Sequence, residues 1–151
     1  MNSGQQATYA VAIAPVAILD DGTAVAAEID TAGVNYAEVV VQLGATDIAM
    51  VALKLTHCDT SGGSFVDITG ADFDGGLNTE GVALALPSAT DDGQTCVFQV
   101  NLDATKRFLK LVVTHGNGSV GGFTAAVARL SSVDVIPVAD TSLATGGVCR
   151  V

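Results

Sequence analysis

Charged residues are scarce in this sequence, and basic residues are the scarcest. Its 151 residues include six Lys or Arg and 16 Asp or Glu, which gives a formal net charge of −10. Nucleic acids and anionic membranes are therefore excluded as expected partners, because both require a basic face. Only 15% of residues are charged and 49% are hydrophobic. This balance excludes a disordered chain and indicates that something other than the chain covers part of its apolar surface.

Cysteine, histidine and tryptophan are also rare or absent. The three cysteines, Cys58, Cys96 and Cys149, are far apart and form no C-x-x-C pair, so neither a disulfide framework nor a zinc site is expected. There is no Trp, and aromatic residues make up 5% of the chain. A carbohydrate-binding surface, which usually stacks sugars on exposed aromatic rings, is therefore the weaker alternative.

We expect no enzymatic activity, no catalytic residue and no cofactor. His57 is adjacent to Cys58, but neighbours in a strand point to opposite faces, so the two do not form a nucleophile and base. His115 begins a Gly-rich turn, where a polar residue is expected. Residues 116–122 match G-x-G-x-x-G, but a strand follows where a dinucleotide site needs a helix, so we interpret them as a hairpin tip.

Pairs of acidic residues occupy the predicted loops: Asp20 with Asp21, Asp72 with Asp74, and Asp91 with Asp92. Carboxylates on flexible loops are typical calcium ligands, but each of these clusters supplies only two. We therefore expect no metal site and interpret these residues as turn caps. Whether they bind calcium is left open.

Apolar residues alternate with polar ones along short runs bounded by Gly, Asp, Asn and Thr, and helical periodicity is hard to find. The pattern predicts a single all-β domain over residues 1–151, a jelly-roll-like β-sandwich of about eight to ten strands. The predicted strands are residues 10–19, 24–30, 36–44, 49–58, 64–68, 82–86, 95–102, 107–115, 123–131 and 133–138.

The two ends differ from the middle. Residues 1–8 form a small, polar N-terminal segment, and residues 139–151 form a C-terminal arm whose apolar side chains have no local partner. Such an arm is either frayed or ordered by a neighbouring molecule, and its candidate contact residues are Leu143, Val148 and Val151. The apolar run 9–19 lacks the preceding positive charge of a secretory signal and is too short to span a bilayer.

Four of the six basic residues, Lys106, Arg107, Lys110 and Arg129, fall in what we interpret as a final hairpin of residues 107–114 and 123–130. One interpretation is ordinary solvated strand charge, which protects strand edges from aggregation. The other is a local positive patch that orients the protein against an acidic partner surface, so that these four residues contact that partner.

Four stretches, residues 64–70, 97–102, 106–114 and 123–131, resemble the small all-β structural proteins of tailed bacteriophages, in particular capsid decoration or cement proteins. The resemblance covers residues 36–131. It implies a homotrimeric jelly-roll-like subunit that is assembled in the host cytoplasm, binds the major capsid protein and reinforces the virion surface without catalysis. It transfers no site residue by motif. With a capsid as the expected partner, we predict that the N-terminal segment, the C-terminal arm and the four basic residues make oligomer or capsid contacts. The alternatives are a tail or baseplate component and a carbohydrate-binding β-sandwich module.

Overall fold

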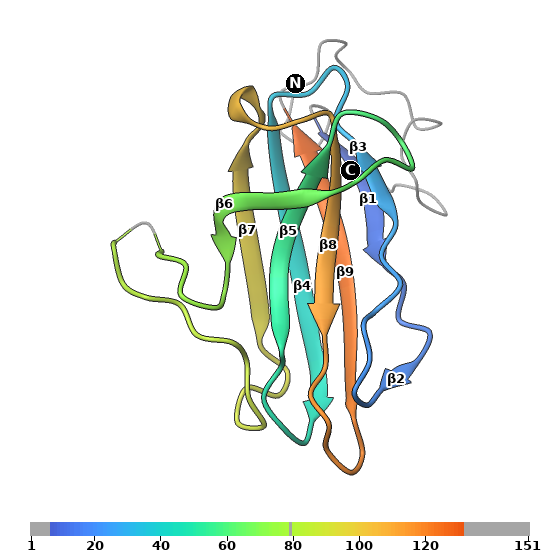
Figure 1. Cartoon of the computed structure of the whole chain (residues 1–151), viewed down its shortest axis with the longest axis vertical. Helices are drawn as coiled ribbons and strands as arrows, with labels where there is room; N and C mark the ends of the chain where they lie inside the picture. Colours follow the sequence, from blue (N-terminus) through green and yellow to red (C-terminus); the bar gives the residue numbers. More distant parts are fainter. Residues whose placement is uncertain (1–6, 79, 132–151) are drawn as a thin grey trace, which may run out of the picture.

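The computed structural model describes residues 7–78 and 80–131, which form two antiparallel sheets packed face to face (Figure 1). One sheet has the strand order β1-β9-β4-β7, with the short strand β2 also paired to β9, and the other has the order β3-β8-β5-β6. The strands are β1 (Ala7–Ile13), β2 (Ile18–Leu19), β3 (Glu28–Asp30), β4 (Tyr36–Thr46), β5 (Ala52–Cys58), β6 (Val66–Asp72), β7 (Thr95–Asn101), β8 (Phe108–Thr114) and β9 (Gly122–Ser131). A 3-10 turn, η2 (Leu102–Ala104), follows β7.

The strand pairs are nested. β1 pairs with β9, β3 with β8, β4 with β7 and β5 with β6, all antiparallel. A long hairpin rolled up so that its outermost strands meet produces this order, which is the jelly-roll arrangement. The predicted all-β, jelly-roll-like sandwich is therefore confirmed. No helix in the described part of the chain has the length and apolarity needed to cross a membrane.

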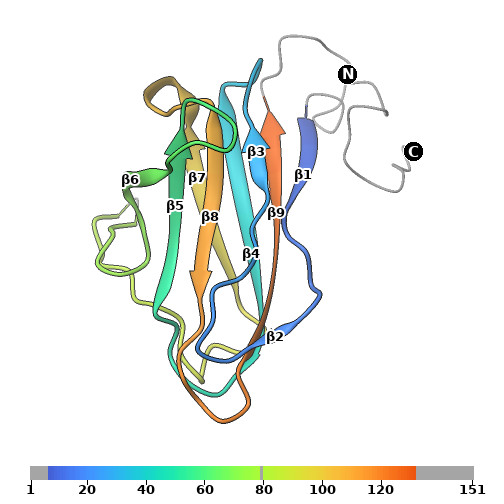
Figure 2. The ribbon, with the colours of Figure 1, turned by 45° about the vertical axis from the view of Figure 1, so that its right-hand side comes forward.

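The core lies between the two sheets, because each long strand turns alternate residues inward. Leu109, Leu111 and Val113 of β8 are buried, while the residues between them are partly exposed. Val39 and Val41 of β4 are completely buried in the facing sheet. Figure 2 shows β5 and β8 on one side of the molecule and β9 and β1 on the other.

Several predicted strands differ from the structure. The run 10–19 is divided into β1 and β2, since Pro15 lacks the N–H that a continuous strand would use. The strand predicted at 24–30 is confined to β3. The one predicted at 64–68 lies at Val66–Asp72, and β1 begins inside the predicted N-terminal segment 1–8. Residues 1–6, the predicted strand 133–138 and the arm 139–151 lie outside the described residues.

The strand predicted at 82–86 is wrong. Its alternating pattern is present, but the hydrogen bonds of this stretch go to a local turn around Asn78. The Val82 N–H donates to the Asn78 side chain at 2.9 Å, and the Leu84 N–H donates to the Gly76 carbonyl at 2.7 Å. Periodicity alone could not show that residues 82–86 form no strand, because the main-chain N–H and C=O groups can find hydrogen-bond partners in a local turn as well as in a sheet.

The predicted final hairpin is also wrong. β8 and β9 are consecutive, yet they belong to different sheets: β8 lies between β3 and β5, and β9 lies between β1 and β4. The connection 115–121 therefore crosses from one sheet to the other. Both strands have one apolar face, and each buries that face against the core from opposite sides. An alternating pattern specifies which face is buried but not which strand is the neighbour.

Candidate functional site

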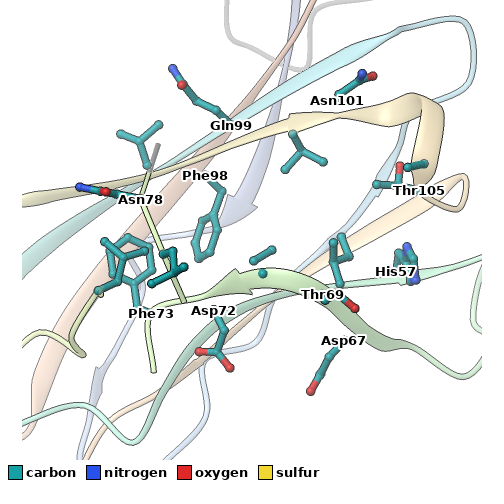
Figure 3. Close-up of a pocket in the computed structure, with 18 residues that line it drawn as sticks. His57, Asp67, Thr69, Asp72, Phe73, Asn78, Phe98, Gln99, Asn101 and Thr105 are labelled. Carbon is teal, nitrogen blue, oxygen red and sulfur yellow. The ribbon is translucent and has the colours of Figure 1, made fainter. Parts of the chain in front are cut away.

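The two sides of the sandwich are closed to different degrees. On one side, β1 meets the segment before β3: the Ala27 N–H donates to the Ala12 carbonyl at 2.8 Å, and Ile13 bridges Ala26. On the other side the edge strands are β6 and β7, and a pocket of about 780 Å³ lies between them (Figure 3). This pocket is the candidate functional site.

Apolar side chains form the inner part of the pocket. Phe73 and Phe98 pack edge to face with ring centroids 5.2 Å apart, and Phe98 is only 5% exposed. Figure 3 shows both rings inside the pocket, while Gln99 points away on the other side of β7. Because Phe98 is almost fully buried and Phe73 is only partly exposed, the pocket lacks the well-exposed aromatic ring on which a sugar usually stacks.

The three titratable side chains that line the pocket already have partners. His57 accepts a hydrogen bond at Nδ1 from the Lys106 N–H at 3.2 Å. Asp67 forms an ion pair with Lys54, with Oδ2 and Nζ 2.7 Å apart. Asp72 accepts the N–H of Asp74 at 2.8 Å. These contacts stabilise local structure and place no base beside a nucleophile.

One wall of the pocket is the outer edge of β7, which pairs only with β4 within residues 7–78 and 80–131. The Leu43 N–H donates to the Gln94 carbonyl and the Leu102 N–H to the Asn35 carbonyl, both at 3.0 Å, just beyond the two ends of the β4–β7 ladder. Alternate residues of an antiparallel ladder bond to the neighbour, so even-numbered residues of β7 bond to β4. The main-chain N–H and C=O groups of the odd-numbered residues therefore face the open edge. These residues are Thr95, Val97, Gln99 and Asn101.

The predicted basic residues near β8 are engaged within the chain. Arg107 holds Asp30 with two hydrogen bonds of 2.8 Å, and this guanidinium lowers the pKa of the Asp30 carboxyl. Lys106 pairs with Asp59 at 3.1 Å. All four side chains are well exposed, so each pair contributes little to stability, up to about 1 kcal/mol.

Lys110 and Arg129 lie on opposite outer faces of the sandwich. Lys110 points outward from β8, and its ammonium lies 5.5 Å from the centre of the Phe65 ring. Arg129 points outward from β9 in the other sheet. The four basic residues therefore form no single patch, although contact with a partner stays a prediction for each. Leu143, Val148 and Val151, also predicted contacts, lie outside the described residues.

Two of the paired acidic loop residues, Asp72 and Asp91, cap local turns as predicted, whereas Asp20 and Asp92 accept N–H groups from distant loops. Asp91 accepts the Ser88 N–H at 2.7 Å and its hydroxyl at 2.9 Å, and Asp20 accepts the Gly118 N–H at 2.8 Å. Within the ranges 7–78 and 80–131, no three His, Cys, Asp or Glu side chains are grouped as a metal site would need.

Two polar residues hold the connection 115–121 in a way that sequence analysis did not predict: Asp47 was not singled out, and His115 was expected in a surface turn. Asp47 Oδ2 accepts the N–H groups of Ser119 and Val120, which lowers the pKa of this carboxyl and fixes residues 115–121. His115 is 2% exposed rather than a surface turn residue, and its Nε2 lies 2.9 Å from the Thr124 hydroxyl. No local sequence pattern indicates these contacts of Asp47 and His115, since they depend on which strands the fold brings together.

The outer face of the β1-β9-β4-β7 sheet carries a row of four valines. Val11 is opposite Val127, Val127 is opposite Val40, and Val40 is opposite Val97. Three of them, Val11, Val127 and Val97, are 41–45% exposed. The one clue in the sequence is Val97, an apolar residue at a position of β7 where the alternation predicts a polar one.

This valine face, defined as the outward side chains of β1, β9, β4 and β7, is almost without charge. Its only charged residues are Glu38 and Arg129, which are opposite one another in the register. The opposite outer face instead carries the ion pairs of Lys54 and Arg107. The two faces of the sandwich therefore differ in chemistry.

Comparison of the chain with models of known families, with curated proteins and with solved structures gave no match.

Proposed function

We propose that this protein is a structural subunit of a bacteriophage virion, a decoration or cement protein that binds the head lattice and stabilises it. The observation that carries the proposal is the valine face. Four valines run straight across an outer sheet face that has one acidic and one basic residue, in a protein of net charge −10. Contiguous exposed apolar surface of this kind marks an interaction site.

The size and charge of the valine face suit a lattice contact. Four strands about 4.8 Å apart and about seven residues long give a flat area of roughly 450 Å². That is more than half of the roughly 800 Å² that each partner buries in a typical interface. Because Glu38 and Arg129 offset each other, this face approaches a protein surface without the repulsion that the rest of the molecule exerts.

The fold and the pocket support the same proposal. Jelly rolls are common among viral capsid proteins, although they also occur in lectins and cupins, so the fold alone does not decide between these functions. The pocket brings together no catalytic pair, and of its two aromatic rings Phe98 is almost fully buried and Phe73 is partly buried. Structural assembly therefore has better support than catalysis or sugar binding.

Virion composition tests the proposal. A tailed phage whose genome carries this gene would be purified, its heads and tails separated, and the chain measured in each by mass spectrometry. We expect the chain in the heads. Recovery with the tails would favour the tail or baseplate alternative, and absence from the virion would refute a structural role.

A matched pair of variants tests the valine face itself. Val127→Glu places a charge at the centre of the valine face, whereas Val25→Glu places the same charge at a site that is 93% exposed and outside it. We expect Val127→Glu to abolish cosedimentation with heads stripped of this chain and Val25→Glu to preserve it. Equal binding by both variants would show that the valine face does not contact the lattice.

A further inference from the structure

We propose that copies of this protein assemble by strand donation, in which residues 133–138 of one copy pair with the free edge of β7 in another. This association needs no capsid and is therefore independent of the function proposed above. It rests on three features: the open edge of β7, the apolar pocket beside it, and the pattern of residues 133–138.

The acceptor is the open edge of β7. Along this edge, Val97 and Gln99 direct their main-chain N–H and C=O groups away from β4, and β4 is the only strand paired with β7 in residues 7–78 and 80–131. An exposed row of such groups is a template for an incoming strand. The pocket between β6 and β7 lies directly beside it.

The donor is the sequence Val-Asp-Val-Ile-Pro-Val at 133–138, in which four of the six residues are β-branched. Pro137 has no N–H, so in any strand its main chain must face away from the partner. Main-chain direction alternates along a strand. The main-chain groups of Asp134, Ile136 and Val138 would therefore form the hydrogen bonds to β7. Pro137 would then face the outer side of the added edge strand, where no N–H is needed.

The same alternation determines which face of the sheet each side chain of the donated strand points to. The free-edge residues of β7, such as Gln99, point to the outer face of the sandwich, and residues opposite one another share a face. In an antiparallel added strand, Asp134, Ile136 and Val138 would thus lie on the outer face. Val133, Val135 and Pro137 would point inward, toward the apolar pocket that contains Phe73 and Phe98.

The donor must come from another copy. Ser131, the last residue of β9, is opposite Tyr36 of β4, which is opposite Asn101 of β7. A strand added beyond β7 lies three strand spacings from β9, roughly 14 Å. The two steps from Ser131 to Val133 cover at most about 7.6 Å. The whole segment therefore cannot reach the β7 edge of its own chain.

Complementation between two defective variants tests the proposal. Deletion of residues 132–151 removes the donor and leaves β7 intact. Gln99→Pro removes a free-edge N–H that β4 does not use, and proline is tolerated in edge strands. Val97→Pro serves as a second acceptor variant if the first fails to fold. We expect an oligomer of the full chain, monomers of each variant alone, and a one-to-one complex on mixing, measured by native mass spectrometry.

Two neighbouring substitutions test the predicted orientation. Val135→Asp would bury a charge in the pocket and should weaken association by about 100-fold or more. Ile136→Asp introduces the same charge one residue later, on the outer face, and should change association by less than about threefold. A loosely attached apolar tail would respond equally to both.

Three results would overturn strand donation: a monomeric full chain, an oligomer that survives deletion of residues 132–151, or a mixture of the two variants that stays monomeric. Each can occur while the chain is still found in phage heads, so failure here is distinguishable from failure of the proposed function.

Discussion

His115 is a buried titratable residue whose protonation should weaken the fold. Its side chain is 2% exposed, Nε2 lies 2.9 Å from the Thr124 hydroxyl, and Nδ1 has no hydrogen-bond partner in the described chain. The imidazolium cation needs an acceptor for both N–H groups, and only one is present. Burial therefore lowers the pKa of His115 and favours the neutral ring.

The direction of the pH dependence follows from this lowered pKa. In the unfolded chain His115 titrates near pH 6.5, so below that pH the unfolded state binds a proton that the folded state does not. Stability should fall as the pH decreases from about 6.5 to the folded pKa, with a limiting slope of about 1.4 kcal/mol per pH unit. For a domain of this size, that corresponds to roughly 3–6 °C in Tm per pH unit.

Thermal unfolding of three proteins between pH 7 and pH 5 tests the reasoning. His115→Gln removes the titration and should flatten the wild-type slope. Thr124→Val removes the hydroxyl but keeps the imidazole, so it should lower Tm at every pH and leave the slope unchanged. The carboxyls with lowered pKa, such as Asp30, lose their contribution only below about pH 4, outside this window. Parallel wild-type and His115→Gln curves would refute the role of His115.

Two further predictions concern the connection between the sheets. Gly122→Ala should lower Tm sharply because the added methyl group would collide with the imidazole of His115. Gly22→Ala should be tolerated, since the atom nearest to its added methyl group is 3.7 Å away. Equal Tm values for the two variants would contradict this packing. Asp47→Ala should speed hydrogen exchange at the Ser119 amide, because the carboxylate that accepts this N–H is lost. NMR would measure the exchange rate, with the amides of β4 as the reference. An unchanged rate would show that other contacts hold the connection 115–121.

The fold could be predicted from the sequence wherever a strand has a clear alternation and a turn on each side. The strands at 36–44 and 95–102 are found within two residues of their predicted ends. Alternation failed where it specified burial but not the neighbour, as for β8 and β9. It failed again at 82–86, where a local turn satisfies the main chain.

The candidate site could not be predicted, because none of its features is local in sequence. The pocket combines β6 with β7, and Phe73, which follows β6, meets Phe98 of β7 only after the chain has crossed between the sheets. The valine row needs the register of four strands. Val97 is the apolar exception to the alternation of its own strand, and its place in the valine row becomes evident only from its position opposite Val40.

Lattice binding by the valine face and strand donation to β7 both involve the β1-β9-β4-β7 sheet, so one can affect the other. The outer face of β3-β8-β5-β6 is charged, and part of it is covered by the loop that places Phe65 over Lys110. In the described part of the chain, the β1-β9-β4-β7 sheet exposes valines on its outer face, and no strand pairs with the outer edge of β7. A strand donated to that edge would place Ile136 and Val138 on the outer side and extend the valine face from four strands to five. Assembly by strand donation would therefore enlarge the surface that we expect to bind the lattice, so the deletion of residues 132–151 should also weaken head binding, whereas Val127→Glu should leave the oligomer intact.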